Sequence, residues 1–463
     1  MFRTATYQNR RRQLVAQLNR GVVLLMGNEE SSMNYADNIY HFRQDSSFLY
    51  YAGIDEPGMA LFIDVDDGRS TLFGPERTLD DIVWMGPQPS LHEMAARSGI
   101  EQDRPAEDLP SVLAEATALG RPIHILPPYR PENKIKLSAW LNASLRQLEQ
   151  MPSAELIRAV VQQRSVKEPQ EIAQMEHAVR VTGAMHTAAM QHARAGMREA
   201  QLAGMVEGIA VGNGGHLAYP VIMTTHGHVL HNHHHHHQLK PGQLVLGDYG
   251  AETAMHYAGD ITRTFPVDKT FTTQQREIYQ AVLDAQEEVI ELIRPGVFNI
   301  DLHRKAALSM ATSLTDIGLM QGDPEEAVEA GAAYLFFPHG LGHMIGLDVH
   351  DMEDLGEHFV GYAGEVERSR EFGLSALRLG RRLQEGFVIT VEPGLYFIPE
   401  LIDRWRAEHR HADFINYAAL EAYRSFSGVR IEDDILVTQN GKRILGDPIP
   451  KTISEVEALR DSN

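Results

Sequence analysis

The sequence predicts an α/β protein built from two domains, and three observations support this. Short apolar runs that suit strands alternate with stretches in which apolar residues recur at helical spacing. The chain has 463 residues, which is long for one domain because a domain averages about 150 residues. A charged segment that contains a proline, RSVKEPQE at 164–171, is typical of a domain boundary. We therefore expect one domain over residues 1–163 and a second over residues 164–463.

The first domain is expected to be a mixed α/β unit. Its apolar runs are short and uninterrupted, as in strands that are buried within a sheet. The amphipathic stretches between these runs favour helices. The expected strands are Val22–Met26, Met59–Val65 and Pro122–Pro127, and the expected helices are Arg10–Leu18 and Lys136–Gln150.

The second domain alternates helices and strands in longer blocks. Ile172–Met190 has a helical pattern. Thr272 and Gln275 have the spacing of a capping box at a helix start, and Pro295 ends the helix that follows. We find no internal repeat at a period of about 20–50 residues. The expected strands are Gln243–Tyr249, Met255–Val267, Gly386–Tyr396 and Gly428–Thr438.

The composition excludes several classes of partner and chemistry. The net charge of −21 repels phosphate backbones, so we expect no nucleic-acid partner. No run approaches about 18 consecutive apolar residues, so we expect no membrane span. The chain has no cysteine, which excludes disulfides, thiolate zinc sites and a cysteine nucleophile. Together with the lack of an apolar leader segment, this predicts a cytoplasmic protein.

Each expected strand of the second domain contains an acid within an apolar run: Asp248, Asp260, Glu392 and Glu432. Buried acids are rare unless they are paired or bind a cation, because a bare charge is costly in low dielectric. One such acid alone is more often a turn residue or a surface charge. Four of them, with the histidine-rich segment FPHGLGHMIGLDVHD, form a hard, oxygen-rich ligand set that suits Mn²⁺. Four carboxylates balance two divalent cations, so the pattern favours a dinuclear metal site.

These motifs resemble those of a known enzyme family. DYG, DITRTFP, HGLGH, VEPG and GVRIEDD are similar to the five-ligand signature of the aminopeptidase P and prolidase metallopeptidases. The segment NYADNIYHFRQDSSFLYYAGIDEP (Asn34–Pro57) resembles the N-terminal domain of aminopeptidase P. The resemblance implies a pita-bread catalytic domain after a smaller mixed α/β domain. It also implies hydrolysis of the peptide bond before proline.

The resemblance implies a role for particular residues. Two divalent ions per subunit are expected, with Mn²⁺ first and Co²⁺ or Zn²⁺ as alternatives. A homodimer or homotetramer is expected, with Trp84 reaching a neighbouring subunit's site. The implied metal ligands are Asp248, Asp260, His343, Glu392 and Glu432; the implied catalytic residues are Glu392, His350, His339 and His231; the implied substrate-binding residues are Arg430, Tyr396 and Trp84.

Three functions remain open, and the insertion Phe397–Ser427 is the reason for the second. The first is an Xaa-Pro aminopeptidase, which releases the N-terminal residue from peptides with proline in second position. The insertion is similar to one in bacterial prolidases, so the second is an Xaa-Pro dipeptidase, with phosphotriester hydrolysis as a side activity. The third, a non-catalytic peptide-binding relative, conflicts with five filled ligand positions.

The segment Thr225–His237 holds eight of the 23 histidines. A metal store and a solvated polar loop are both compatible with its sequence.

Overall fold

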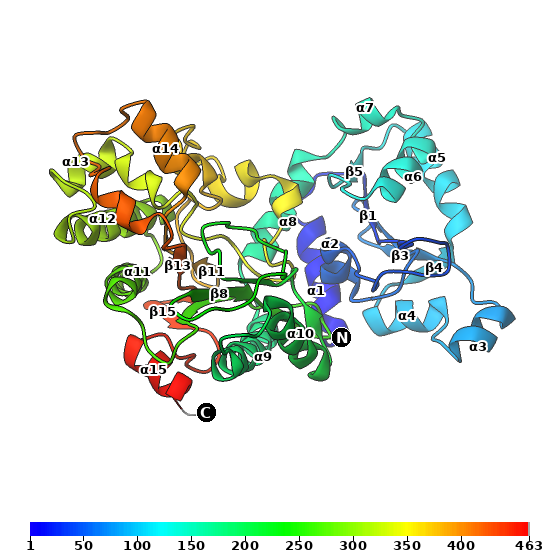
Figure 1. Cartoon of the computed structure of the whole chain (residues 1–463). Coiled ribbons are helices and arrows are strands. Elements are labelled where there is room, and N and C mark those ends of the chain that lie inside the picture. Colours follow the sequence, from blue (N-terminus) through cyan, green and yellow to red (C-terminus); the bar gives the residue numbers. More distant parts are fainter. Residues whose placement is uncertain (462–463) are drawn as a thin grey trace. The chain divides into compact units, whose positions relative to one another are not determined.

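The structure, a computed structural model, describes residues 1–461 (Figure 1). The chain divides into two compact units. The first contains Met1–Arg164 together with the short segment Asp354–Phe359, and the second contains Ser165–Glu353 and the chain from Val360 onward. The boundary expected between residues 163 and 164 adjoins Arg164. Among the described residues, no helix is both long enough and apolar enough to cross a bilayer.

The first unit is built on a five-stranded mixed sheet with the strand order β4-β3-β2-β1-β5. Strand β1, which lies between β2 and β5, pairs antiparallel with β2 and parallel with β5. Helices α5 to α7 bury apolar side chains, such as Leu113 and Leu137, against Leu24 and Phe62 of the sheet. The elements are α1 (Thr4–Val15), β1 (Val22–Met26), α2 (Ser46–Ala52), β2 (Ala60–Asp64), β3 (Ser70–Gly74), α3 (Leu79–Met85), α4 (Leu91–Ser98), β4 (Gln102–Pro105), α5 (Leu109–Ala118), β5 (Ile123–Ile125), α6 (Pro131–Trp140), α7 (Leu145–Leu148) and α8 (Ala154–Ser165).

The single helix expected over Lys136–Gln150 is wrong. The chain forms α6, a turn and then the short helix α7. Asn142 in the turn has a positive φ of 48°, which an α-helix does not allow. Ser144 then caps α7, because its side chain accepts a hydrogen bond from the Gln147 backbone N–H. A local capping box therefore interrupts the helical pattern.

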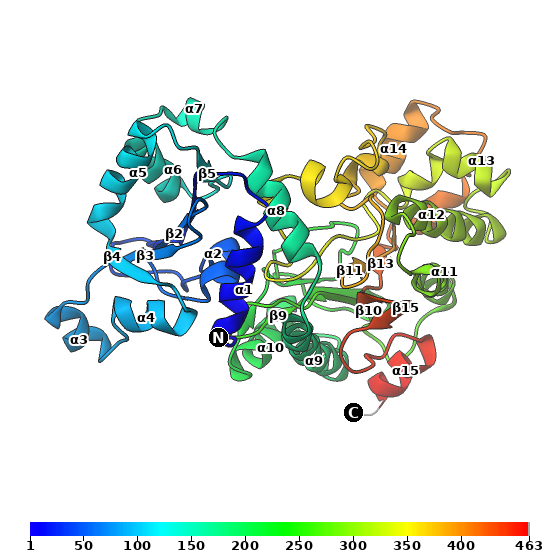
Figure 2. The ribbon, with the colours of Figure 1, turned by 180° about the vertical axis from the view of Figure 1, so that it is seen from behind.

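The second unit contains two three-stranded sheets, with the orders β10-β8-β7 and β11-β14-β15, and two short strand pairs, β12-β13 and β6-β9. Figures 1 and 2 show long helices around these strands. The elements are α9 (Pro169–His192), α10 (Glu199–Gly212), β6 (His216–Leu217), β7 (Ile222–Thr224), β8 (Leu244–Tyr249), β9 (Ala251–Glu252), β10 (Ile261–Pro266), α11 (Thr273–Leu292), α12 (Asn299–Asp316), α13 (Pro324–Glu329), β11 (Val388–Val391), β12 (Gly394–Tyr396), α14 (Pro399–Ala407), β13 (Gly428–Arg430), β14 (Asp433–Thr438), β15 (Gly441–Ile444) and α15 (Ile453–Asp461).

Two pairs of helices in this unit are joined by the same kind of turn. Gly196 between α9 and α10 has a φ of 92°, and Gly296 between α11 and α12 has a φ of 93°, a backbone conformation that favours glycine. The Gly196 N–H donates to the Leu239 carbonyl, and the Gly296 N–H donates to the Leu383 carbonyl. Each partner leucine precedes a strand, β8 or β11. The second unit therefore repeats one helix-turn-helix and strand arrangement.

Three of the expected strands are interrupted beside an acid. Strand β10 begins at Ile261, because the chain before it turns at His256, where φ is 65°. The strand expected over Gly386–Tyr396 breaks after β11, where Pro393 has no N–H to donate to a ladder. The strand expected over Gly428–Thr438 breaks between β13 and β14. The acids Asp260, Glu392 and Glu432 lie at these breaks rather than inside continuous strands.

Candidate metal centre

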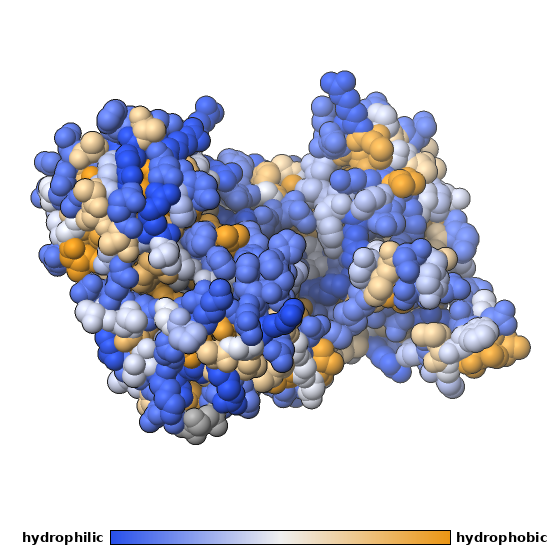
Figure 3. Space-filling model, in the orientation of Figure 1, coloured by the Kyte–Doolittle hydropathy of each residue, from blue (hydrophilic) through white to orange (hydrophobic). Residues whose placement is uncertain are grey.

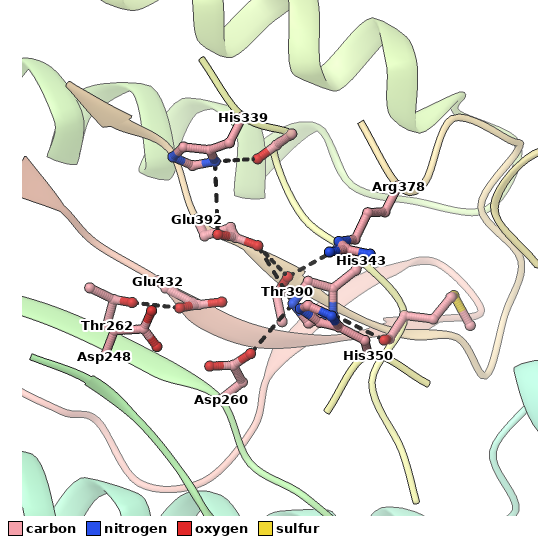
Figure 4. Close-up of polar contacts among 12 residues, drawn as sticks. Asp248, Asp260, Thr262, His339, His343, His350, Arg378, Thr390, Glu392 and Glu432 are labelled. Carbon is pink, nitrogen blue, oxygen red and sulfur yellow. Dashed lines mark hydrogen bonds and ion pairs between the residues drawn. The ribbon is translucent and has the colours of Figure 1, made fainter. Parts of the chain in front are cut away.

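The second unit encloses a cavity of about 480 Å³. Figure 4 shows the acids Asp248, Asp260, Glu392 and Glu432 together with His343 around a common space. Apolar residues, among them Ile222, Leu230 and Val349, complete part of its wall. The predicted site residues that line the cavity are Asp248, Asp260, His343, Glu392, Glu432, His231, His339, His350 and Arg430.

The four acids come from two antiparallel strand pairs. Asp248 lies in β8, and Asp260 directly precedes β10, the strand that pairs with β8. Glu392 directly follows β11, and Glu432 directly precedes β14, the strand that pairs with β11. Each strand pair thus places two acids at one of its ends. Hydrogen bonding within a sheet brings side chains together here that are far apart in sequence.

His343 comes from the loop after a short helical turn and is held against β11. Its backbone N–H donates to the Thr390 hydroxyl at 3.0 Å, and its carbonyl accepts from the Thr390 N–H at 3.0 Å. The His343 ring Nδ1 lies 3.1 Å from the Met344 carbonyl, so Nδ1 carries the hydrogen and donates it. The other ring nitrogen, Nε2, faces the carboxylates of Asp260, at 3.4 Å, and Glu392, at 3.6 Å. A cation between these atoms would satisfy all three.

The buried acids repel one another. Burial, followed by the charges of Asp260, Glu392 and Asp248, raises the pKa of Glu432 well above its ordinary value. Burial is also the largest cause that raises the pKa of Glu392. Asp260, His343 and Glu432 are buried, and each offers a ligand atom within 4.8 Å of the others. Because divalent cations would relieve this repulsion and hard oxygen ligands suit them, the residues present fit a metal site.

Neighbouring hydroxyl groups orient the acids, and the sequence analysis did not single them out. The Tyr219 hydroxyl lies 2.7 Å from Asp248 Oδ1 and also bonds Asp260. The Thr262 hydroxyl donates to Glu432 Oε2 at 2.7 Å. Thr262 could have been found, because it lies two residues after Asp260 on the same strand face. Tyr219 had no sequence signal, since it is far from the acids along the chain.

Arg430, Tyr396 and His339 form a directed chain of hydrogen bonds. Arg430 Nη1 donates to the Tyr396 hydroxyl at 2.7 Å. His339 Nδ1 donates to the Gly340 carbonyl at 2.8 Å, so its Nε2 accepts from the Tyr396 hydroxyl at 2.8 Å. Burial and the nearby Arg430 lower the pKa of His339 to about 3, which keeps the ring neutral. Arg430 also bonds Asp248, so this chain links His339 to the acids.

His350 and Arg378 converge on Glu353 at the cavity. His350 Nδ1 lies 2.7 Å from Glu353 Oε2, and Arg378 bonds the other carboxylate oxygen. The bond from His350 is the largest cause that lowers the pKa of Glu353 to about 2. Because an ionised carboxylate only accepts, His350 Nδ1 carries the hydrogen. Arg378 lines the cavity and was missed, since arginine in a charged segment is ordinarily a surface residue.

Trp84 does not belong to the unit that contains the cavity. It belongs to α3 in the first unit, and its side chain is 83% exposed.

Asp433, beside Glu432, forms ion pairs with Arg263 at 2.7 Å and Lys451 at 2.9 Å. Asp433 is therefore a structural acid.

The site as a whole has buried acids with an imidazole at one end of the cavity and neutral or hydrogen-bonded histidines beside them. This combination is typical of metal-dependent hydrolases, which need a cation site and a group that moves protons. The model of "Metallopeptidase family M24" matches residues 173–439, and the model of "Aminopeptidase P, N-terminal domain" matches residues 7–124. The chain belongs to metallopeptidase family M24.

Relatives cover almost the whole chain. A human protein named Xaa-Pro dipeptidase is 34% identical over 94% of this chain and 88% of its own length. The Xaa-Pro aminopeptidase of Escherichia coli is 34% identical over 98% of this chain and 97% of its own. A solved structure of E. coli aminopeptidase P, in complex with product, superimposes with a TM-score of 0.82 at 30% identity, covering 99% and 98% of the two chains. The pita-bread domain preceded by an aminopeptidase P-type domain, expected from the sequence, is confirmed.

Proposed function

We propose that this protein hydrolyses the peptide bond between an N-terminal residue and proline, as an Xaa-Pro aminopeptidase. One observation carries the proposal: four acids and a histidine from separate segments converge in one cavity. The names of the relatives supply the substrate class, because both Xaa-Pro aminopeptidases and Xaa-Pro dipeptidases are among them.

The ligand set of the proposed site is Asp248, Asp260, His343, Glu392 and Glu432. Two divalent ions per subunit would balance the four carboxylates, and Mn²⁺ suits a set dominated by oxygen. Co²⁺ and Zn²⁺ are alternatives, because imidazole and carboxylate also bind them. The position of His343 Nε2, which faces two acids, supports the presence of a cation.

Bound divalent ions would polarise the scissile carbonyl and make a water molecule acidic enough to attack near neutral pH. Glu392 would accept the proton of that water, because its carboxylate lines the cavity beside His343. His339 would contact the substrate through its ring, because both ring nitrogens are already hydrogen-bonded, Nδ1 to the Gly340 carbonyl and Nε2 to the Tyr396 hydroxyl. His350, fixed by Glu353, would pass a proton to the leaving proline nitrogen.

The same cavity accounts for recognition of the substrate. A peptide bond before proline has no N–H, so the enzyme must recognise the ring by shape. Apolar side chains such as Ile222 and Val349 can pack against such a ring. The free amine of the substrate would lie beside the acids, and Arg430 and His231 would complete the substrate contacts.

An Xaa-Pro dipeptidase is the second candidate function, and Arg378 favours it. A dipeptide ends directly after proline in a carboxylate, and Arg378 and His231 line the cavity. The guanidinium of Arg378 would bind the carboxylate of a dipeptide. A longer peptide has no carboxylate directly after proline, so Arg378 would not increase its affinity to the same extent. Arg378→Met should therefore raise KM for an Xaa-Pro dipeptide tenfold or more. KM for an Xaa-Pro-Xaa tripeptide should change less than threefold.

The decisive experiment assays Xaa-Pro dipeptides, longer Xaa-Pro peptides and a phosphotriester side by side with Mn²⁺. Glu432→Gln should lower kcat/KM at least a thousandfold and reduce the metal bound after dialysis. The matched control is Asp433→Asn, which changes the adjacent acid. It should lower the melting temperature, because Arg263 loses its charged partner, yet keep the bound metal. Full activity of Glu432→Gln without metal would contradict the proposal.

Two further features belong to this proposal. We expect a homodimer or homotetramer, supported by the apolar side chains that α3 exposes, and Trp84 as the residue that contacts a neighbouring subunit's substrate. The cytoplasmic location expected from the sequence stays a prediction.

A further inference from the structure

The histidine-rich segment Thr225–His237 has no part in the proposed reaction apart from His231. Three of its imidazoles gather at the two ends of the segment. The ring centres of His226 and His237 are 4.2 Å apart, and those of His236 and His237 are 4.1 Å apart. Neighbouring residues of an extended chain ordinarily point to opposite sides. His236 nevertheless packs its ring against that of His237, its neighbour in sequence.

Buried Glu199, at the start of α10, fixes the backbone of both ends. Its carboxylate accepts hydrogen bonds from the Thr225 N–H at 2.7 Å and from the His237 N–H at 3.2 Å. Its own N–H donates to the His237 carbonyl at 3.0 Å, and the Ala200 N–H donates to the His235 carbonyl at 3.1 Å. The imidazoles are thus brought together by a bonded framework and not by chance contact of flexible side chains.

The hydrogen bonds of His226 leave one ring nitrogen suited to a metal ion. The Thr225 hydroxyl donates its hydrogen to Glu199 Oε1 at 3.1 Å. The same hydroxyl oxygen lies 3.2 Å from His226 Nδ1 and therefore accepts from it. The lone pair of His226 is then on Nε2. Histidine ligands ordinarily donate their other N–H to a neighbouring acceptor in this way.

We propose that His226 and His237 bind one divalent transition-metal ion of the class that prefers imidazole, such as Zn²⁺ or Ni²⁺. Two imidazoles that bind one tetrahedral ion at about 2.0–2.1 Å have ring centres roughly 5 Å apart. The separation of 4.2 Å between the rings of His226 and His237 is within a small side-chain rotation of this value. His226 and His237 are partly exposed, so an ion can reach them.

This loop site differs in chemistry from the acid-rich centre. Imidazole ligands alone favour Zn²⁺, Ni²⁺ and Cu²⁺, whereas carboxylates favour Mn²⁺ and Mg²⁺. An ion bound to His226 and His237 would join the two ends of the loop. His231 and His233, which lie between them in sequence, line the catalytic cavity. The bound ion would therefore restrict a segment that forms part of the cavity wall.

The test measures Zn²⁺ bound to the full chain after dialysis against buffer with a large excess of Mn²⁺. Wild-type protein should bind one more Zn²⁺ per chain than His226→Gln/His237→Gln, and the affinity for that ion should fall at least a hundredfold in the variant. Any Zn²⁺ that enters the acid-rich centre is present in both proteins, so it cancels when the two amounts are subtracted. Two controls should match wild type: His177→Gln/His192→Gln, which removes two exposed imidazoles elsewhere, and His234→Gln, which removes one from the same run.

A second arm separates this site from the proposed function. Asp260→Asn/Glu432→Gln should lose metal from the acid-rich centre and still bind Zn²⁺ at the loop. Far-ultraviolet circular dichroism without Zn²⁺ checks that every variant is folded, and in excess Mn²⁺ the addition of Zn²⁺ should raise the melting temperature of wild type by more than that of the loop variant. Equal Zn²⁺ in wild type and His226→Gln/His237→Gln would overturn the proposal. So would an equal loss in His234→Gln, since binding would then be spread along the run.

Discussion

Tyr396 links charged Arg430 to neutral His339 within the site. Its hydroxyl accepts from Arg430 and donates to His339, so one oxygen holds both side chains. His339 Nδ1 is committed to the Gly340 carbonyl. The orientation of the His339 ring therefore depends on a hydroxyl that is itself buried.

Replacement of Tyr396 by phenylalanine should lower kcat about 10- to 100-fold and leave KM nearly unchanged. The ring still fills its volume, but His339 loses its donor and Arg430 loses a buried acceptor, which costs roughly 1–3 kcal/mol of stability. Steady-state kinetics on an Xaa-Pro peptide and thermal denaturation measure both effects. Tyr417→Phe, which removes a hydroxyl that donates to the Arg410 carbonyl, is the control and should retain full kcat. An unchanged kcat in Tyr396→Phe would show that His339 needs no such support.

For individual residues, the sequence predicted the acids of the site well, but it did not predict the side chains that lie around them. Asp248 and Glu432 stand out because a charge within an apolar run is costly unless something compensates it. Tyr219 and Arg378 do not stand out, because tyrosine before proline and arginine in a polar loop are ordinary on a surface. Only the folded chain brings the Tyr219 hydroxyl onto two acids.

At the scale of an element, helix α11 begins as its sequence predicts. The Thr272 side chain accepts from the Gln275 N–H, and the Gln275 side chain accepts from the Thr272 N–H. Thr272→Ala should lower the free energy of unfolding by about 1 kcal/mol, because a helix N–H loses its partner. Denaturant unfolding measures this. Thr273→Ala, one residue into the helix, is the control, and both variants should retain kcat. A stability equal to wild type would mean that packing alone fixes the start of α11.

The strands were predicted less precisely than the helices. Apolar runs located the four strands that carry or adjoin the acids, but they did not reveal strand β7 or the breaks at Asp260, Glu392 and Glu432. A break depends on tertiary contacts, such as the Glu432 N–H donating to the Thr262 carbonyl of another strand. The repeat of the two glycine turns was also missed, because the copies, Gly196 and Gly296, are much farther apart than the 20–50 residues searched.

At the scale of the whole molecule, the crowded acids make stability depend on pH and on metal. A carboxyl group whose pKa is raised on folding stabilises the fold below its ordinary pKa, and this contribution is lost as pH rises toward the raised value. The pKa values of Glu392 and Glu432 are raised by burial and by mutual repulsion. Above about pH 4.5 the metal-free fold therefore loses stability from these two groups as pH rises.

Glu432→Gln should consequently stabilise the metal-free protein, and by more at pH 8 than at pH 5.5. The comparison of melting temperatures in a chelator isolates this effect, because other titrating groups are common to both proteins. With Mn²⁺ at pH 8 the order should reverse, since wild type gains stability from binding the ion. A difference between the two proteins that does not vary with pH would contradict the raised pKa of Glu432.

The exposed surface of α3 is suited to contacts between subunits. None of its residues is buried, and Leu79, Val83, Trp84 and Met85 are each at least 69% exposed. Figure 3 shows hydrophobic surface at the lower right, where Figure 1 labels α3. A cluster of exposed apolar side chains is typical of an interaction surface, whereas single ones are normal.

Trp84→Ala should shift the protein toward smaller species in sedimentation velocity and leave the helical circular dichroism unchanged. Leu119→Ala, which removes a similarly exposed but isolated apolar side chain, should sediment as wild type. If Trp84→Ala sediments as wild type at every concentration, α3 does not form the interface.

The repeated arrangement of the second unit has one more consequence. Gly242 and Gly386 lie six residues before Asp248 and Glu392, and the strand that pairs with each of these segments starts beside a second acid. Each half of the second unit thus supplies two carboxylates. A polypeptide with a single half could assemble all four carboxylates only by associating with another copy, and the rate of that association would depend on the protein concentration. Joining both halves in one chain makes that encounter intramolecular, so the full set of acids forms however scarce the protein is.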